Sequence, residues 1–274
     1  MGSPMPTGEG SELVPRCLTI AGSDSGGGAG IQADLKAFAA AGSHGMSVIV
    51  ALTAQNTEGV TAVHEAPPQF VRAQLDAVFS DIGVDAAKTG MLFSRALIDV
   101  VADYLETQRV PLVVDPVMIA SSGARLLQED AVETLVERLF PLATVVTPNL
   151  HEARALAGVP LQQTVTRPEL AERIVERGVR AVIVTGGHGD EPVDHLFDGA
   201  RHVEIPVDRH DVQATHGAGC THSATLAAYL ARGQTLDVAA RAAAEAAGEA
   251  VRHGLAELGA GEGPVDVLDV KGAQ

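Results

Sequence analysis

Cysteine, tryptophan and lysine are scarce in this chain of 274 residues. Cys17 and Cys220 are its only cysteines, too few for a disulfide framework, so we expect a reducing compartment, the cytoplasm. Aromatic residues make up 3% and tryptophan is absent, so alanine, valine and leucine must form the core. Lysine occurs only as Lys36, Lys88 and Lys271. A phosphate site would therefore have to use backbone amides, arginine or a metal ion.

Positive charge is also in short supply. The chain has 19 Lys and Arg against 35 Asp and Glu, a formal net charge of −16 at pH 7. This balance argues against nucleic acid and anionic membranes as partners, because both require a basic face. No apolar run reaches transmembrane length, and residues 1–15 lack the layout of a signal peptide. A small anionic substrate is still compatible, because backbone dipoles act locally.

Short apolar segments alternate with alanine-rich segments along the chain, and this alternation predicts the fold. Repeated β-α-β units with short connections are typical of a three-layer α/β/α fold with a mainly parallel central sheet. Buried strands are predicted at 17–21, 47–53, 86–89, 112–115, 144–147 and 180–185, and helices at 29–41, 70–80, 94–107, 130–139 and 168–177.

The remaining segments complete this prediction. Residues 193–197 and 201–206, separated by Asp198 and Gly199, predict a hairpin at one edge of the sheet. Residues 218–254 predict two helices with a break at 232–234. Residues 1–15 are expected to be a flexible tail, and the absence of any composition shift predicts a single domain over 16–274.

In such a sheet, ligands bind beyond the carboxyl ends of the strands. Four of the segments that follow these ends, here called strand exits, are candidate sites. Residues 21–30 have five glycines in nine residues, which lets a ligand approach the backbone. They have neither the Walker pattern nor the G-x-G-x-x-G spacing of dinucleotide sites. Residues 185–188 form a second glycine-containing exit, which is weak evidence by itself.

The exit at 215–221 leads into a predicted helix and contains Cys220. Small residues at a helix start can form an anion hole from backbone amides, and the same field would lower the pKa of the Cys220 thiol. A buried cysteine at an ordinary tight helix entry explains this segment equally well.

The exit at 148–152 contains Asn149 and Glu152, three residues apart at a predicted helix start. An amide oxygen and a carboxylate suit Mg²⁺, which keeps some of its own waters. The same pair is also the signature of a capping box, and from these two residues alone the capping box is favoured. Asp115, at the end of another predicted strand, is more simply explained as a turn residue.

Seven segments carry a more specific pattern when they are taken together and in order. They are residues 19–24, 28–36, 53–57, 88–91, 115–118, 147–149 and 216–221. In this pattern the chain resembles the hydroxymethylpyrimidine/phosphomethylpyrimidine kinases, a branch of the ribokinase-like superfamily, from Leu18 to about Val265.

The resemblance implies a ribokinase-like fold and a two-step reaction in thiamine biosynthesis. ATP would phosphorylate 4-amino-5-hydroxymethyl-2-methylpyrimidine, and then its monophosphate to the diphosphate. Mg²⁺ and a homodimer are implied as well. The implied substrate-binding residues are Gly22, Asp34, Gln55, Met91 and Val117, and the implied ATP-binding residues are Asp115, Asn149, Thr185, Gly187 and His216. The implied catalytic residues are Gly217, Ala218, Gly219 and Cys220, and Asn149 and Glu152 would hold Mg²⁺ through water.

Cys220 stands where most relatives have an aspartate base, and we expect it to take the hydroxyl proton in the first step. A carboxylate about 4 Å from the phosphate of the second substrate would repel each unit of charge by roughly 4 kcal/mol at an effective dielectric near 20. A neutral thiol avoids that repulsion. Two departures from the family pattern, Thr185 and Ser121 in place of lysines, remove cations that could contact phosphates.

Three alternatives remain open. A pyridoxal or pyridoxine kinase of the same branch also phosphorylates a hydroxymethyl group on a nitrogen heterocycle. A non-catalytic nucleotide-binding regulator would fit the missing lysines. A covalent thiol hydrolase using Cys220 with His216 or His222 lacks an orienting acid.

Overall fold

The computed structural model describes residues 14–272 apart from 121–122, 129, 161 and 188–191, and the predicted tail at 1–13 lies outside the described residues. One sheet of nine strands runs through this part of the chain in the order β3-β2-β1-β4-β5-β6-β7-β8-β9. Neighbours from β2 to β7 are parallel, and β3, β8 and β9 are antiparallel to theirs. The strands are β1 (Arg16–Asp24), β2 (His44–Gln55), β3 (Val60–Glu65), β4 (Ala86–Thr89), β5 (Leu112–Val114), β6 (Val145–Val146), β7 (Val182–Val184), β8 (Val193–Phe197) and β9 (His202–Pro206).

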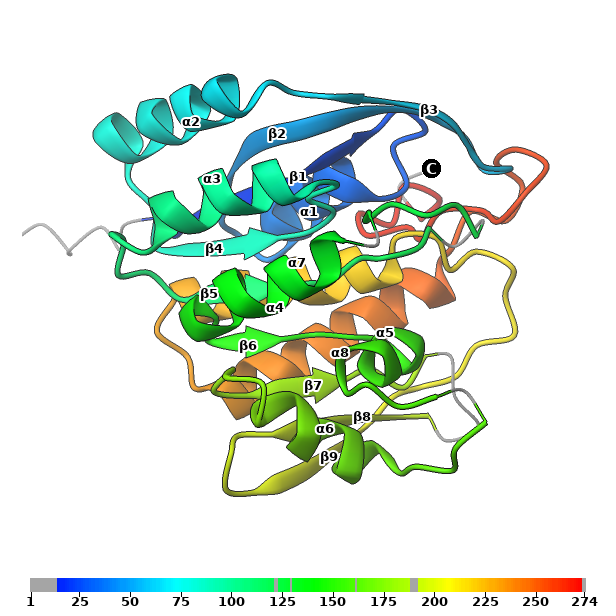
Figure 1. The fold of residues 1–274 in the computed structure, drawn as a ribbon. Helices are drawn as coiled ribbons and strands as arrows, with labels where there is room; N and C mark the ends of the chain where they lie inside the picture. Colours follow the sequence, from blue (N-terminus) through cyan, green and yellow to red (C-terminus); the bar gives the residue numbers. More distant parts are fainter. Residues whose placement is uncertain (1–13, 121–122, 129, 161, 188–191, 273–274) are drawn as a thin grey trace, which may run out of the picture.

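Helices cover both faces of the sheet, which confirms the predicted three-layer architecture (Figure 1). One layer contains α2 (Pro68–Ala77), α3 (Arg95–Leu105), α4 (Ala131–Leu139), α5 (Leu150–Leu156) and α6 (Arg167–Val175). The other contains α1 (Gly30–Ala40), α7 (Ala218–Ala231) and α8 (Leu236–Arg252). A π-helical turn (Val78–Ile82) follows α2, and a 3₁₀ turn (Phe140–Leu142) follows α4.

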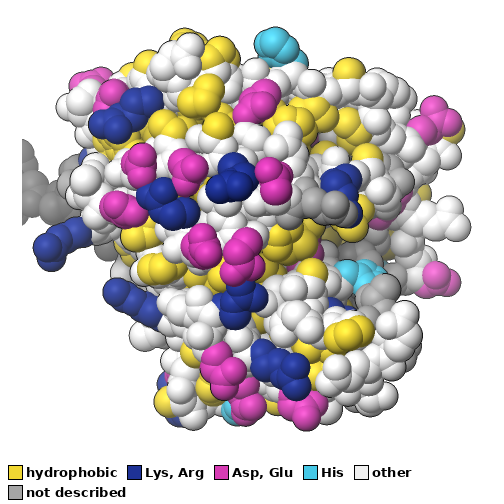
Figure 2. Space-filling model, viewed as in Figure 1, with side chains coloured by type: hydrophobic (Ala, Val, Ile, Leu, Met, Phe, Trp, Pro, Cys, Tyr) yellow, Lys and Arg dark blue, Asp and Glu magenta, His cyan; other side chains and the backbone are white. Residues whose placement is uncertain are grey.

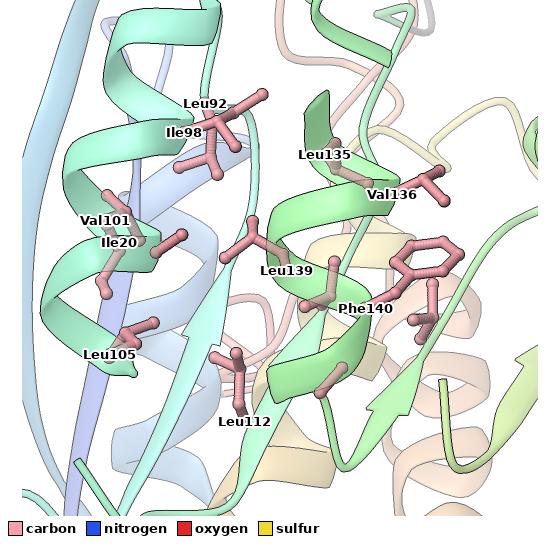
Figure 3. Close-up of a cluster of buried hydrophobic side chains, with 14 of the residues drawn as sticks. Ile20, Leu92, Ile98, Val101, Leu105, Leu112, Leu135, Val136, Leu139 and Phe140 are labelled. Carbon is pink, nitrogen blue, oxygen red and sulfur yellow. The ribbon is translucent and has the colours of Figure 1, made fainter. Parts of the chain in front are cut away.

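Each helix layer packs on its own side of the sheet through aliphatic side chains. Figure 3 shows the first layer, where Ile98, Val101 and Leu105 of α3 and Leu135 and Leu139 of α4 converge on the sheet. Burying such side chains contributes roughly 1.5–3 kcal/mol each. On the other side, alanines of α7 and α8 allow close packing of these two helices. The core is thus mainly aliphatic, as the shortage of aromatic residues predicts, with Phe38 and Phe140 among its few aromatic side chains.

The strand β3 and the length of β2 were not predicted. Residues 60–65 include Thr61, His64 and Glu65, and none of the six residues is buried, so they lack the continuous apolar run of a buried strand. β3 is held as the edge strand by its antiparallel pairing to β2, a contact that local sequence does not indicate. The helix α5 was expected only as a helix start. The hairpin β8–β9 and the two C-terminal helices are confirmed.

The pairing of β1 with β2 contains a register shift: Ala21 lies opposite Ile49 and Gly22 lies opposite Ala51, so Val50 of β2 is an extra residue. Such a bulge bends the strand that carries it and increases its twist, and bulges are frequent beside active sites. Here it lies in β2, just before the residues that pair with the last three residues of β1, which lead into the glycine-rich loop at 25–30.

Charged side chains of both signs are mixed on the face drawn in Figure 2. Arg138 of α4 pairs with Asp99, Asp103 and Glu106 from α3 and its end, and Arg177 pairs with Glu133. No basic patch appears on this face. Among the described residues, no helix is long and apolar enough to cross a membrane.

Candidate active site

Asp24, the last residue of β1, shapes the glycine-rich loop that follows it. Its carboxylate accepts hydrogen bonds from the amides of Gly26, Gly28 and Ala29 at 2.7, 3.0 and 2.8 Å. Its Oδ2 also lies 3.0 Å from Nε2 of His216. Burial would raise the pKa of Asp24, but the hydrogen bonds from His216 and the loop amides outweigh it and lower the pKa. Asp24 is therefore a carboxylate that ties the loop to the segment before α7.

The glycine-rich loop and the start of α7 touch through their backbones. Gly217, the residue before α7, has φ 90°, and a Cβ there would overlap the carbonyl oxygen of Gly28. A Cβ at Gly28 would in turn overlap the ring of His216. Glycine is required at these positions because of close approach and, at Gly217, because of the left-handed backbone. Two predicted strand exits thus meet, as the kinase resemblance implies.

Within the described residues no side chain caps the start of α7. The amide of Ala218 donates to the carbonyl of Thr215 at 3.0 Å, and the amides of Gly219 and Cys220 are left for an anion. Cys220 lies in this turn and is only partly buried. The expectation that the helix start lowers its pKa is wrong: burial raises the pKa of the Cys220 thiol to about 12, against the opposing effect of Lys88. The nearby carboxylates of Asp34 and Asp115 raise it further. The thiol is uncharged at neutral pH.

A buried ion pair lies beneath Cys220. The ammonium of Lys88 in β4 lies 2.9 and 3.0 Å from the two carboxylate oxygens of Asp34, and both side chains are fully buried. Thr19 donates a further hydrogen bond of 2.6 Å to Asp34. Burial would lower the pKa of Lys88, but the carboxylates of Asp34 and Asp115 and the nearby Cys220 outweigh it and raise the pKa. Both oxygens of Asp34, a predicted substrate contact, are therefore engaged with protein groups.

Asp115, at the end of β5, connects this ion pair to α7. Its Oδ2 accepts a hydrogen bond of 2.8 Å from Ser223 and lies 3.5 Å from the ammonium of Lys88. Ser223 is one turn into α7 from Cys220. The start of α7 is thus anchored to the sheet by a side chain.

An apolar wall lies next to Gly22. A Cβ on Gly22 would overlap the terminal methyl of Met91, and the amide of Gly22 donates to the carbonyl of Met91 at 3.2 Å. Met91 packs in a small cluster separate from the main core, and the members of that cluster are Ala51, Val60, Val63, Met91, Val117, Ala120 and Leu126. Three predicted substrate contacts, Gly22, Met91 and Val117, therefore share one region.

Gln55, at the end of β2, joins this region to the segment before α7. Its Nε2 lies 3.4 Å from Nε2 of His216, and its Oε1 accepts from the hydroxyl of Thr53 at 3.2 Å. His216, predicted as an ATP contact, is itself buried between Asp24 and Gln55. Gln55 and Cys220 therefore lie on the same side of the molecule, linked by His216.

The start of α5 has both hydrogen bonds of a capping box. Asn149 Oδ1 accepts from the amide of Glu152 at 3.0 Å, and Glu152 Oε2 accepts from the amide of Asn149 at 2.9 Å. Burial, with the nearby charge of Asp115, raises the pKa of Glu152 to about 8. Two buried carboxyl groups that repel one another are a suitable setting for a cation. Among the described residues, no cluster of three His, Cys, Asp or Glu could form a complete protein cage for it.

Thr185 lies beside Asn149. Its amide donates to the carbonyl of Pro148 at 2.9 Å, and Thr185 and Asn149 form a parallel bridge. Gly187 is exposed, and a Cβ added to it would meet no atom within 4 Å. The predicted exit at 185–188 is described as far as Gly187, and His188 and Ser121 lie outside the described residues.

The kinase resemblance gave no role to Lys88 and Asp24 at this site, nor to Asp194 and His222, which lie outside it in β8 and α7. A lysine inside the predicted apolar strand 86–89 was the one signal for the buried ion pair. Asp24 and His216 are 192 residues apart, so nothing local indicates that they meet.

The fold and these contacts define a ribokinase-like phosphotransferase, with a glycine loop, an uncapped helix start and a neighbouring apolar cluster around Met91. Residues 24–266 match the model of the phosphomethylpyrimidine kinase family. The chain belongs to this family.

Relatives and solved structures agree. The chain is 50% identical over 256 residues to the hydroxymethylpyrimidine/phosphomethylpyrimidine kinase of Rhizobium meliloti, covering 90% of this chain and 95% of that one. It is also 50% identical over 253 residues to a thiamine biosynthesis bifunctional protein of Geobacter sulfurreducens, covering 91% of this chain but only 51% of that longer protein.

Among solved structures, a phosphomethylpyrimidine kinase of Clostridium difficile matches with a TM-score of 0.74 and 41% identity, covering 84% of this chain and 96% of that one. An ADP complex of Bacillus subtilis pyridoxal kinase matches with a TM-score of 0.85 and 36% identity, covering 94% and 99%.

Proposed function

We propose that this protein transfers a phosphoryl group from ATP to 4-amino-5-hydroxymethyl-2-methylpyrimidine, and then a second one to the resulting monophosphate, in thiamine biosynthesis. The observation that carries this proposal is the meeting of the glycine-rich loop with the uncapped start of α7, one His216 ring away from Gln55. This arrangement offers an anion hole beside a pocket with an apolar wall and one amide side chain.

The acceptor would lie against Met91 and Val117, with Gln55 at its polar edge. One amide can donate to a ring nitrogen and accept from the exocyclic amine. Gly22 leaves room for the Met91 side chain, because any side chain at position 22 would overlap the Met91 methyl, and so it fixes where this apolar wall stands. Asp34 would act on the acceptor through Lys88 rather than by direct contact, since its oxygens are already engaged.

The transferring phosphoryl group would be held by the amides of Gly217, Gly219 and Cys220, and by that of Ala218 if it leaves the carbonyl of Thr215. Phosphoryl transfer passes through a loose transition state, so positioning and charge stabilisation supply most of the catalysis. Amides already aimed at the anion need no reorganisation when charge develops.

Cys220 would take the hydroxyl proton in the first step. A thiol with a pKa near 12 rarely carries the negative charge that this requires at pH 7. We therefore expect proton transfer to Cys220 to accelerate the first step by about 100-fold, the low end of the range for a general base. The second step needs no base, because the phosphate nucleophile has a second pKa near 6. The neutral thiol repels neither acceptor.

Asn149 and Glu152 would hold Mg²⁺ through water, with Asp115 close by. When bound, the ion would neutralise charge on the phosphates. The donor set fits this role: Glu152 is buried beside a second carboxyl group, and Mg²⁺ prefers one or two carboxylates together with phosphate and water. ATP would lie along Asp115, Asn149, Thr185 and Gly187, near His216. A homodimer and a cytoplasmic location stay predictions.

The test is phosphorus NMR of the products formed from ATP, Mg²⁺ and the pyrimidine alcohol. We expect the monophosphate first and the diphosphate later, with ADP released in both steps. ATP bound without any ADP formed would overturn the proposal in favour of a regulator.

Pyridoxal kinase is the second candidate, because the Bacillus subtilis pyridoxal kinase shares this fold at a TM-score of 0.85. Turnover of pyridoxal and of the pyrimidine alcohol, measured side by side, decides between them. We expect a higher kcat/KM for the pyrimidine, and the reverse order would favour the second candidate.

A further inference from the structure

Two buried polar side chains outside the site described above lie between α7 and the end of the sheet. Asp194 in β8 and His222 in α7 are 3% and 4% exposed, and Nε2 of His222 lies 3.1 Å from Oδ2 of Asp194. The two atoms are close, but their geometry is not that of a hydrogen bond. Neither ring nitrogen of His222 has a hydrogen-bond partner within the described residues. Burying polar side chains is costly unless they are hydrogen-bonded or paired, so the burial of these two residues together calls for a reason.

The other oxygen of Asp194 points to the strand exit on the nucleotide side. Oδ1 accepts a hydrogen bond of 2.7 Å from the amide of Gly186, the first residue after Thr185. Gly186 also packs against the backbone of Val193 so closely that a Cβ would overlap the Val193 carbonyl oxygen. One carboxylate therefore fixes the turn at 186–187.

His222 belongs to the same stretch of α7 as the proposed anion hole. It comes two residues after Cys220 and directly before Ser223, which donates to Asp115 at the end of β5. Adjacent side chains of α7 thus reach two different strand exits: Ser223 reaches that of β5, and His222, through Asp194, reaches that of β7. The Gly186 turn is in turn continuous with Thr185, which is bonded to Pro148 beside Asn149.

We propose that Asp194 and His222 are positioning residues that hold the turn at 186–187 in register with the start of α7. This rests on the proposed function. The pair acts on the nucleotide side alone, because none of its contacts reaches Gln55, Met91 or Val117. Loosening the pair would let the turn move relative to the anion hole and would weaken the binding of ATP, while the acceptor pocket would keep its shape.

The experiment compares His222→Gln and Asp194→Asn with the wild type. We expect KM for ATP to rise about tenfold and KM for the pyrimidine alcohol to stay within twofold. Calorimetric titration with a non-hydrolysable ATP analogue should show the same tenfold weakening in the absence of acceptor. The matched control is Asp85→Asn, which breaks the Arg16–Asp85 ion pair (2.6 Å) at the start of β4 and should leave both KM values unchanged.

A merely structural role would lower the melting temperature and change both KM values alike, and that result, or no change at all, would overturn the proposal. If Asp194→Asn fails to fold, His222→Gln decides alone, because it retains a polar side chain of similar size. A wild type that binds the ATP analogue but phosphorylates no pyrimidine would instead refute the proposed function, and the titrations would still test the pair.

Discussion

Helices α5 and α7 both begin at the carboxyl edge of the sheet, but their first turns are built differently. The start of α5 is closed by its own side chains, since Asn149 and Glu152 satisfy one another's backbone amides. The start of α7 has no capping side chain, and a left-handed Gly217 takes the place of a cap. The missing cap is replaced by contact with a second loop, through Gly28 and Asp24.

The side-chain cap stabilises α5, whereas the uncapped start of α7 stays open to a ligand. A capping box typically contributes about 1 kcal/mol, and a helix that forgoes it keeps free N–H groups and the positive end of its dipole for an anion. Beneath this open turn of α7, the buried side chains of Lys88, Asp34 and Asp115 form a rigid support. The predictions below test each part of the comparison.

The largest effect is expected beneath the α7 start, at Lys88. Replacing Lys88 by Met leaves the carboxylates of Asp34 and Asp115 buried without their cation. Breaking a buried pair by removing one partner typically costs about 3–5 kcal/mol, so we expect the free energy of unfolding in urea at pH 7 to fall by that amount.

The pH dependence and a control sharpen this test. Because the pKa of Lys88 is raised in the folded protein, its stabilisation is complete below the ordinary value of 10.5 and is lost only as pH rises through the raised value. The deficit of Lys88→Met should therefore be undiminished between pH 7 and about 9. In Lys271→Met, which breaks a surface pair with Glu257, the loss should stay below about 1 kcal/mol. Equal losses would contradict the buried role.

Gly217→Ala attacks the α7 start itself. The new methyl group overlaps the Gly28 carbonyl, so the glycine-rich loop and the start of α7 must move apart. The amides at the start of α7 would then no longer point at the phosphoryl group. We expect kcat to fall by about 10²–10³ for both phosphorylations, as when an oxyanion donor is lost. Gly233→Ala is the control, because Gly233 also has a positive φ (72°) but no neighbour within 4 Å of a Cβ. Wild-type kcat in Gly217→Ala would rule out this account.

Cys220→Ala should separate the two chemical steps. We expect phosphorylation of the alcohol to slow about 100-fold, the low end for a lost base, and phosphorylation of the monophosphate to change far less. Stopped-flow or quench measurements of each step provide the test. Cys17→Ala, in a buried cysteine at the far end of β1, should affect neither step. Equal losses in both steps would exclude Cys220 as the base.

The same thiol predicts a pH profile. With a pKa near 12, the thiolate fraction grows about tenfold for each pH unit, so the rate of the alcohol step in the wild type should rise with pH from 7 to about 9. With Mg²⁺ saturating, so that Glu152 would stay ionised although its pKa without the ion is about 8, the monophosphate step should be flat over that range. In Cys220→Ala the slope of the first step should disappear, and its persistence would mean that another group takes the proton.

Asn149 tests the closed helix start. In Asn149→Ala, loss of the cap should lower the free energy of unfolding by about 1 kcal/mol and activity by about tenfold. Asn149→Ser keeps a capping oxygen and should restore stability. If the amide also serves the ligands, activity stays low in the serine variant. Full recovery of activity in Asn149→Ser would show that Asn149 acts only as a helix cap.

Thr185→Lys gives the smallest effect. It adds a cation beside Asn149, where the family commonly has one, and we expect KM for ATP to fall about threefold. Gln108→Lys adds the same charge in the connection before β5, away from the strand exits, and should leave KM unchanged. An unchanged KM in Thr185→Lys would show that the missing lysine was not a phosphate contact.

Much of the fold follows from the sequence because buried parallel strands and alanine-rich helices have strong local patterns. β3 lacks such a pattern, since its place depends on pairing with β2. In the same way, the apolar wall around Met91 includes Val60 and Val63 of β3, which local sequence does not connect to the site.

For the site, glycine-rich exits and Cys220 are visible in the sequence, whereas the charges that surround them are not. The thiol pKa was predicted in the wrong direction because burial and the carboxylates of Asp34 and Asp115 outweigh the helix field. The ties from Asp24 to His216 and from Asp194 to His222 join distant segments. Only the folded chain brings them together.

The bulge in β2 sets the register of the end of β1, and this has a consequence for how the protein can change over time. Side chains alternate between the two faces of a strand, so removing or adding one residue at Ala21–Gly22 would exchange inward and outward positions up to Asp24. An insertion tolerated in a surface loop would here turn the anchor of the glycine loop away from His216. We therefore expect length variation among natural variants to be confined to other connections, with the spacing from Thr19 to Gly30 held constant.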